Sequence, residues 1–423
     1  MTTDAMRGIE TKHEVYYLAS EKVTPFKKLW NKPRFAGTYY FPDELAVEHY
    51  ALFNILMWRN RYKSPSFQFR FKRLLHMELL KYRKRNYIRQ LKRFAVAYTH
   101  ASTSPLYAVF GKQRDIPIAQ DLLDHIKRVN PDMIIYPSSA YDPDGNDIVR
   151  ISKMLGIKTV FLIDNWDNLS SKTIFWAFPD HLGVWGRQSK DHAIDIHNFR
   201  PEQVTVLGTP RFDDYYGETP PSPFSFQYAL FTGQAIPFDE LSALRELETE
   251  MRRRAYDFKI IYRPHPWRQA RLCDDIFKEA QFKHIILDPQ IKDAYYNRKS
   301  IQPDLKYYPA LLKNAKFVIS TPTTMLIESL LCNKHVVLIA YDDGIHLTNP
   351  RNSLKNYQHF DGIVNIPQVH VCDSKDMLGM SLHRSFDTDG HADVSYYIFN
   401  DGRRYKDRLS ELVGRVGAEK TGS

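Results

Sequence analysis

The sequence predicts an α/β fold made of two doubly wound domains, each a largely parallel sheet covered by helices. From about residue 104, short apolar strands alternate with helical segments, which is typical of βαβ units. Residues 213–226 interrupt this alternation with prolines and polar residues, and it then starts again. We therefore expect a first domain over 1–215, a linker over 216–227, a second domain over 228–400, and a C-terminal helix and tail over 401–423.

In the first domain, short apolar runs of strand type follow helical segments with little sequence between them. The expected strands are 132–137, 158–163, 180–186 and 203–208, and the expected helices are 114–131, 147–156 and 187–199. The helix over 147–156 ends at a glycine, a common C-terminal stop.

The second domain repeats this order after the linker. The expected strands are 228–233, 258–266, 284–289, 316–320 and 335–343, and the expected helices are 238–257, 272–282, 304–315 and 323–333. In such sheets, ligands bind at the carboxyl ends of the strands. Residues that directly follow a strand are therefore the first candidates for function.

Composition excludes several classes of protein. The chain has 423 residues, 43% of them hydrophobic and 26% charged, which is ordinary for globular domains. No apolar run approaches the ~20 residues that a transmembrane helix needs, and the first 20 residues are too polar for a signal peptide. The cysteines are three and widely separated (Cys273, Cys332 and Cys372). We therefore expect a reducing cytoplasm, no disulfide framework and no metal site.

Positive charge gathers in one segment of a chain whose formal net charge is +10. Residues 70–94 contain ten Lys or Arg and the single acid Glu78, with leucines at helical spacing. A solvated helix face, a contact with anionic lipid and a nucleic-acid patch all fit this pattern. No nucleic-acid motif accompanies it, so we expect no nucleic-acid partner. If the segment contacts anionic lipid, the protein is expected at the inner face of the cytoplasmic membrane.

Hydroxyl side chains cluster where the strand over 316–320 meets the next helix. They are Ser320, Thr321, Thr323 and Thr324, and Glu328 follows one helical turn after Thr324. One of these residues would cap the helix. Four in five positions, with the free N–H groups of a helix start, also predict a phosphate site. Glu328 would accept hydrogen bonds from a ribose.

A histidine between two prolines ends the strand over 258–266. Arg263, Pro264, His265 and Pro266 follow its apolar residues. Proline fixes its own φ and restricts the residue before it, so Arg263 and His265 are held extended. The segment is either a Pro-rich turn or a rigid mount for a side chain that faces a ligand.

The order of these motifs resembles the donor-binding half of GT-B glycosyltransferases and their relatives, the CDP-glycerol polymer transferases. VLGTPRFDDYY (206–216) is similar to the G-x-P-R-x-D signature of the latter group. RPHP is similar to a His-Pro element that they share with bacterial transferases of sialic acid and Kdo. The signature residues here are Gly208, Pro210, Arg211 and Asp213. The resemblance covers about residues 130–345.

The resemblance implies a GT-B fold, two Rossmann-like domains facing a central cleft, and a donor site in the second domain. His265 would donate to the leaving phosphate, with Pro266 beside it, and Arg263 would contribute positive charge. The hydroxyl cluster would hold the phosphate oxygens. The G-x-P-R-x-D residues would lie between the domains on the donor side. The resemblance also implies an inverting enzyme without a cofactor, whose nucleotide-sugar is a substrate. Apart from DPD at 142–144, no clear DxD metal motif follows a strand, so we expect a metal-independent reaction.

The general base should come from a strand end of the first domain. Asp144, with Asp142 and Gly145, resembles the acidic-acidic-glycine element of some sialyltransferases. Asp164 and Asp167 flank Trp166, an apolar platform for a sugar ring. Asp167, Asp164 and Asp144 all remain candidates.

The sequence therefore predicts a glycosyltransferase of bacterial surface-polysaccharide synthesis. A CMP-sugar such as CMP-Kdo is the favoured donor, and a cell-surface glycan or lipid-linked molecule is the acceptor. IDNWDNLSSK (163–172) stands where glycerol-polymer enzymes have a His-Gly pair, which favours a sugar over glycerol phosphate. The alternatives are a CDP-glycerol or CDP-ribitol polyol-phosphate transferase, a nucleotide-sugar epimerase, and a non-catalytic GT-B scaffold.

Overall fold

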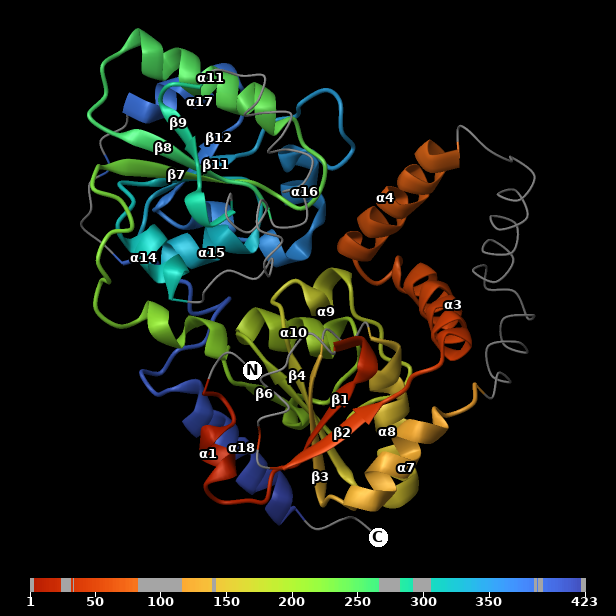
Figure 1. Cartoon of the computed structure of the whole chain (residues 1–423). Coiled ribbons are helices and arrows are strands. Elements are labelled where there is room, and N and C mark those ends of the chain that lie inside the picture. The colour runs from red at the N-terminus through yellow and green to blue at the C-terminus, as the bar shows by residue number, and fades with distance from the viewer. Residues whose placement is uncertain are drawn as a thin grey trace. The chain divides into compact units, whose positions relative to one another are not determined.

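The computed structural model describes residues 4–23, 32, 34–82, 116–138, 142–265, 282–291, 306–383, 386 and 391–419. The chain forms two compact units. Unit 1 consists of Met1–Pro210 and Ser395–Ser423, and unit 2 of Arg211–Val394. Each contains a parallel sheet with helices (Figure 1), which confirms the predicted α/β class.

Unit 1 is built around four parallel strands in the order β3-β4-β5-β6. These are β3 (Met133–Ser138), β4 (Lys158–Ile163), β5 (His181–Val184) and β6 (Val204–Val206). The helices that follow or precede them are α7 (Gln120–Val129), α8 (Pro143–Leu155), α9 (Asn168–Ser171) and α10 (Arg187–Asp195). The predicted strands and helices of this domain are thus present.

Both faces of the unit 1 sheet are buried, which explains why β4 is apolar from Val160 to Ile163. Phe161 and Ile163 lie in one core cluster with residues of α8. Val160 and Leu162 lie in another, with Leu409 and Leu412 of α18 (Tyr405–Ala418). A strand covered on both sides reads as a continuous apolar run, because neither face meets water.

Unit 2 contains six parallel strands in the order β12-β11-β10-β7-β8-β9. Counted along the chain from β7, this is the doubly wound order 3-2-1-4-5-6, whose direction reverses between β7 and β10. The strands are β7 (Tyr228–Thr232), β8 (Lys259–Arg263), β9 (Ile285–Leu287), β10 (Val318–Ser320), β11 (Val336–Ile339) and β12 (Val369–Cys372).

Helices cover both faces of this sheet. On one side lie α11 (Glu240–Arg253) and α17 (Asp376–Met380). On the other side lie α14 (Tyr307–Lys313) and α15 (Thr324–Leu331) (Figure 1). A further helix, α16 (Pro350–Asn356), follows β11. The expected helix over 272–282 lies almost wholly outside the described residues.

Several elements were not predicted. They include β12, the parallel pair β1 (Tyr17–Ser20) and β2 (Phe35–Tyr39), and the helices α1 (Arg7–Glu10) and α3 (Asp43–Asn60). In β12, His370 and Cys372 break the β-branched pattern. The β1–β2 pair is short and only partly buried, so neither strand shows a clean alternation of polar and apolar residues.

The basic segment begins as a packed helix. Its first residues belong to α4 (Pro65–Tyr82), while residues 83–94 lie outside the described residues. Arg70 is buried and its Nη1 donates to the Ser171 carbonyl of α9 at 2.8 Å. The expectation of a solvated or lipid-facing cation is therefore wrong for Arg70, since its guanidinium satisfies a backbone carbonyl inside unit 1. No described helix has the length and apolar character to cross a membrane.

The observed division of the chain differs from the expected one at two places. It falls at Pro210 and Arg211, inside the G-x-P-R-x-D segment, and again at Val394 and Ser395. Residues 216–227 form no helix or strand but belong to unit 2, where Asn314 donates to the Pro220 carbonyl at 2.9 Å. The C-terminal helix α18 lies beside α1 in unit 1 (Figure 1).

Candidate functional site

The carboxyl ends of β7 and β10 meet at the point where the strand order of unit 2 reverses. There the Thr232 hydroxyl donates to Ser320 Oγ at 2.9 Å, and Ser320 Oγ donates to the Thr321 carbonyl at 2.8 Å. Thr321 Oγ1 lies 3.5 Å from the Thr232 carbonyl. All three side chains are buried. Ser320 and Thr321 therefore join the two strand ends, and their hydroxyl groups are already in use within the protein.

Thr323 is different. It is the N-cap residue of α15, with extended backbone (φ −146°), and no side chain caps this helix. Its Oγ1 is buried and has no hydrogen-bond partner among the described residues. The first N–H groups of a helix lack partners within it. Thr323 Oγ1 and the start of α15, where half-buried Thr324 follows, thus offer hydrogen-bonding capacity to a ligand.

Glu328 lies one turn into α15 and is completely buried. Arg211 Nη2 donates to its Oε1 at 2.5 Å, and the Tyr215 hydroxyl donates to Oε2. Burial and the Glu328 charge raise the pKa of Tyr215 well above its usual value. Both carboxylate oxygens of Glu328 thus have protein partners, and Glu328 holds Arg211 in place. These contacts account for the buried carboxylate, so the expected hydrogen bonds to a ribose do not follow from them.

Arg263 also faces the interior. Its guanidinium pairs with buried Asp288, donates to Gln290 Oε1 at 3.0 Å and lies over the Tyr308 ring at 4.5 Å. This arrangement fastens β8 to the segment after β9, so the expected contribution of charge to a phosphate does not follow from it. His265 is half-buried directly after β8, and its role stays a prediction. Pro266 lies outside the described residues.

The other signature residues lie on both sides of the division. Gly208 has φ +76°, and a Cβ there would approach the Phe399 carbonyl oxygen to 2.6 Å. Glycine is thus required for a close backbone contact within unit 1. Pro210 begins a 3-10 helix over Pro210–Tyr215 that includes half-buried Asp213.

Acidic residues follow β3 and β4 in unit 1. Asp144 accepts hydrogen bonds from two tyrosines, Tyr39 of β2 and Tyr136 of β3, the latter at 2.9 Å. Burial followed by the Asp144 charge raises the pKa of both phenols, so both remain donors. Both carboxylate oxygens of Asp144 therefore have a phenolic partner.

Asp164 and Asp167 lie in the loop between β4 and α9. Lys172 Nζ is 2.6 Å from Asp167 Oδ2, and Asn168 donates to Asp164. The carboxyl group of Asp164 stands among protein groups that reduce its solvation. Asp164 is exposed as a residue, but the reduced solvation of its carboxyl raises its pKa. The charges of Asp142 and Asp167 act in the same direction, against the Asn168 hydrogen bond and the Lys172 charge. Trp166 is buried, so its ring packs in the core of unit 1 and does not offer the expected open platform.

Two features of the unit 2 loops had not been recognised from the sequence. Gly233 follows β7, and a Cβ there would lie 2.5 Å from Glu240 Oε2. After β11, His346 Nδ1 lies 2.7 Å from Asp343 Oδ2. The signal for the second was an Asp and a His three positions apart directly after a strand.

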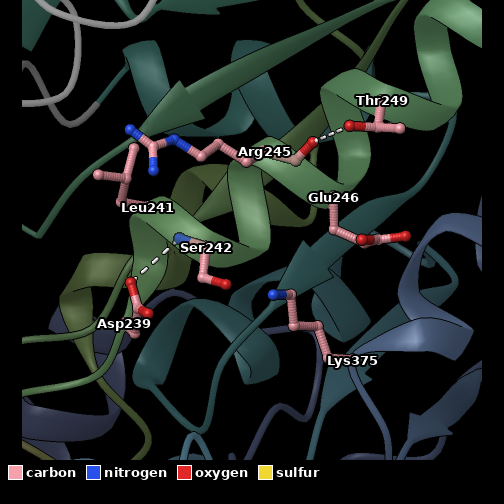
Figure 2. Close-up of a pocket in the computed structure, with 7 residues that line it drawn as sticks. All are labelled: Asp239, Leu241, Ser242, Arg245, Glu246, Thr249 and Lys375. Atoms are coloured by element: carbon pink, nitrogen blue, oxygen red, sulfur yellow. Dashed lines mark hydrogen bonds between the residues drawn. The ribbon is translucent and has the colours of Figure 1, made fainter.

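The structure also shows a hollow of about 390 Å³ on the outer side of α11. It is lined by Asp239, Leu241, Ser242, Arg245, Glu246, Thr249 and Lys375. Figure 2 shows the Arg245 and Glu246 side chains pointing in different directions. No residue predicted from the sequence lies in it, and we assign it no ligand. Within the described ranges, no three His, Cys, Asp or Glu side chains gather to hold a metal ion.

Comparisons with known proteins found likenesses in structure alone. No protein-family model matches the sequence, and no curated protein matches it. The UDP-GlcNAc 2-epimerase of Methanocaldococcus jannaschii, solved with UDP-GlcNAc and UDP, is 12% identical with a TM-score of 0.44, over 70% of this chain and 79% of that one. MurG of Acinetobacter baumannii is 10% identical with a TM-score of 0.39, over 70% and 77%.

A third similar structure is the wall teichoic acid polymerase TagF. It is 13% identical with a TM-score of 0.37, over 57% of this chain and 59% of that one. All three TM-scores are below 0.5, and all three identities are 13% or less.

Proposed function

We propose that this protein is a glycosyltransferase of the GT-B type that binds a nucleotide-activated sugar at the carboxyl edge of the unit 2 sheet. The observation that carries the proposal is the unpartnered Thr323 hydroxyl at the start of α15. It lies directly after β10, one of the two strands at which the strand order reverses. Ligands of doubly wound sheets bind at this reversal, and a helix start favours phosphate.

The donor in this proposal is a nucleotide-sugar, with a CMP-sugar favoured. The RPHP segment after β8 and the hydroxyl run after β10 support it, since they resemble the donor-binding elements of CMP-sugar transferases. The acceptor is a cell-surface glycan or a lipid-linked precursor, and the reaction inverts the sugar without a metal ion. The acceptor would bring the basic segment 70–94 to an anionic membrane surface.

Asp164 is the general base in this proposal. An inverting transferase needs a group that removes the proton from the acceptor hydroxyl as the sugar is transferred. The pKa of Asp164 is raised, and a carboxylate with a raised pKa accepts a proton more readily. Both oxygens of Asp144, by contrast, already accept hydrogen bonds from tyrosines. Asp167 forms an ion pair with Lys172, so it is the second candidate for the base.

A thermal-shift titration with CMP, CDP, UDP and GDP tests the donor site. A ligand that binds only the folded state raises the melting temperature by mass action. We expect one nucleotide to stabilise the wild type and Thr323→Val to lose most of that shift, since valine keeps the shape but not the hydroxyl. Thr249→Val is the matched control, because Thr249 is an exposed threonine of α11 whose hydroxyl bonds the Arg245 carbonyl.

The outcomes separate the proposal from its competitors. No shift with any nucleotide contradicts the donor site and favours a non-catalytic scaffold. If the protein binds nucleotide but converts a nucleotide-sugar with no acceptor present, it is an epimerase. Release of CMP with phosphorus retained in the product identifies a polyol-phosphate transferase.

A further inference from the structure

The loop after β11 holds a histidine paired with a buried carboxylate. The His346 side chain is 33% exposed, whereas that of Asp343 is 3% exposed. Asp343 Oδ1 accepts hydrogen bonds from the N–H groups of Ile345 and His346 at 3.0 and 2.8 Å. Its Oδ2 accepts the Asp239 N–H at 3.0 Å and lies 2.7 Å from His346 Nδ1.

These contacts determine which ring nitrogen faces the protein. Burial alone would raise the pKa of Asp343, but the hydrogen bonds from His346 and from backbone N–H groups outweigh it and hold that pKa below its usual value. An ionised carboxylate only accepts hydrogen bonds, so Nδ1 of His346 must carry the proton. Nε2 has no hydrogen-bond or ion-pair partner among the described residues. It is therefore the nitrogen that can meet a ligand.

The position of the loop brings this ring to the donor side of unit 2. Strand β11 lies beside β10, with Leu338 opposite Ser320, so the loop leaves the same sheet edge as the hydroxyl run. It is also bonded to the loop after β7. Thr348 Oγ1 donates to the Pro237 carbonyl at 2.8 Å, and Gln234 Nε2 donates to the Thr348 carbonyl at 3.3 Å. Because β10 separates β7 from β11, the joined loops border the carboxyl end of β10.

We propose that His346 is a ligand-binding residue whose Nε2 contacts a phosphate oxygen of the nucleotide donor, and that Asp343 positions it. A ring with both protons donates from Nδ1 to Asp343 and from Nε2 to the phosphate at once. This inference rests on the proposed function and adds a contact that neither the hydroxyl run nor the RPHP segment supplies. Loss of a hydrogen bond between charged groups weakens binding about tenfold or more.

The test compares nucleotides with their nucleosides by isothermal titration calorimetry. CMP, CDP, UDP and GDP are titrated into the full chain, and then cytidine, uridine and guanosine. We expect His346→Ala to weaken the bound nucleotide about tenfold or more and to leave the matching nucleoside unchanged, because only the phosphate contact is lost. Asp343→Asn should produce a smaller loss of the same kind.

His284→Ala is the matched control. The His284 side chain is 35% exposed and its Nδ1 lies 3.2 Å from Glu248 Oε1. This pair therefore has the same chemistry as the His346 pair. However, His284 precedes β9 and so lies at the amino edge of the same sheet, where no ligand is expected. We expect this variant to bind nucleotide as the wild type does.

Each outcome decides the inference. Equal affinity in His346→Ala and wild type, or equal loss for nucleotide and nucleoside, overturns the phosphate contact and leaves the proposed donor site intact. Failure of the wild type to bind any nucleotide overturns the donor site and this inference together. Melting curves of each variant without ligand show whether a loss comes from unfolding.

Discussion

At the scale of single residues, neighbouring hydroxyl groups of one short run have different partners. Ser320 and Thr321 are bonded within the protein, whereas Thr323 Oγ1 is buried without a partner in the described part of the chain. The sequence presents them as equivalent members of one cluster. The backbone course at the end of β10 places Ser320 and Thr321 between the strands and leaves Thr323 Oγ1 outside these bonds.

Arg211 and Glu328 provide a prediction about stability. We expect Arg211→Met to lower the free energy of unfolding of unit 2 by about 3 kcal/mol, because it leaves a buried carboxylate without its cation. Chemical denaturation followed by fluorescence measures this change. Replacing both residues by methionine should recover most of the loss, since no buried charge then remains.

Arg253→Met is the control for this pair. Arg253 Nη2 lies 2.6 Å from Glu250 Oε2, but its side chain is 62% exposed, and Glu250 keeps His383 and Arg254 as partners. Exposed pairs contribute at most about 1 kcal/mol, so the change should be small. Equal losses in Arg211→Met and Arg253→Met would show that the Arg211 pair is not structurally special.

Asp164 provides a prediction about pH. Because its folded-state pKa lies above 3.8, its ionised form costs stability at neutral pH, and that cost disappears as pH falls through the raised pKa. Asp164→Asn should thus melt at a slightly higher temperature than wild type at pH 7, and the difference should vanish near pH 3. Transferase activity should fall by a factor of about 10² or more.

Melting curves at several pH values check the first part. A variant less stable than wild type at pH 7 would mean that the carboxylate makes a stabilising contact in its ionised form. Unchanged activity would pass the role of base to Asp167 or Asp144.

At the scale of helices and strands, α4 combines packing with charge. Arg70 points into unit 1 and donates to α9, whereas the next cation, Lys72, is exposed. Ser64, just before the helix, donates to the Ser170 carbonyl at 3.3 Å. The first turns of α4 therefore complete the hydrogen bonds at the end of α9, close in sequence to Asp164 and Asp167.

We expect substitutions of Arg70 and Lys72 to affect different properties, the stability of unit 1 and the binding of anionic lipid. Arg70→Met should destabilise unit 1 by about 1–3 kcal/mol, because a buried carbonyl loses its donor, and should leave flotation with anionic liposomes unchanged. Lys72→Met should leave stability within about 0.5 kcal/mol but weaken flotation at low salt, since each cation near an anionic surface contributes about 1 kcal/mol. If wild type does not float at any salt concentration, the membrane proposal fails.

Strands buried on both faces were the elements best predicted from the sequence. The runs that became β4, β7 and β8 are short, apolar and followed by turn residues. By contrast, β12 contains a histidine, and β1 and β2 are half-buried. Local pattern does not identify such strands, because their pairing depends on partners far away in the sequence.

The sequence predicted where the site residues lie along the chain better than it predicted which side chains they contact. Periodicity correctly placed the hydroxyl run at the end of one strand and Arg263 at the end of another. It did not show that Arg263 would turn inward to Asp288, that Glu328 would hold Arg211, or that Asp144 would bond two tyrosines. Those contacts join residues from separate elements, and a single sequence carries no signal of them.

At the scale of the whole molecule, the chain passes between the units twice, at Pro210–Arg211 and at Val394–Ser395. Residues from both ends of the sequence complete unit 1. Lys158 donates to the Val416 carbonyl at 2.7 Å, and His181 Nε2 lies 2.8 Å from Glu419. The helix α18 covers Val160, Leu162 and Leu207 on one face of the unit 1 sheet.

This arrangement affects the order of folding during synthesis. All residues of unit 2 emerge from the ribosome before α18 does, so unit 2 can finish folding while one face of the unit 1 sheet is still uncovered. Domains usually fold from the N-terminus onward, and here the first unit to begin is the last to be completed. Until α18 arrives, Val160, Leu162 and Leu207 lack the helix that covers them in the folded protein.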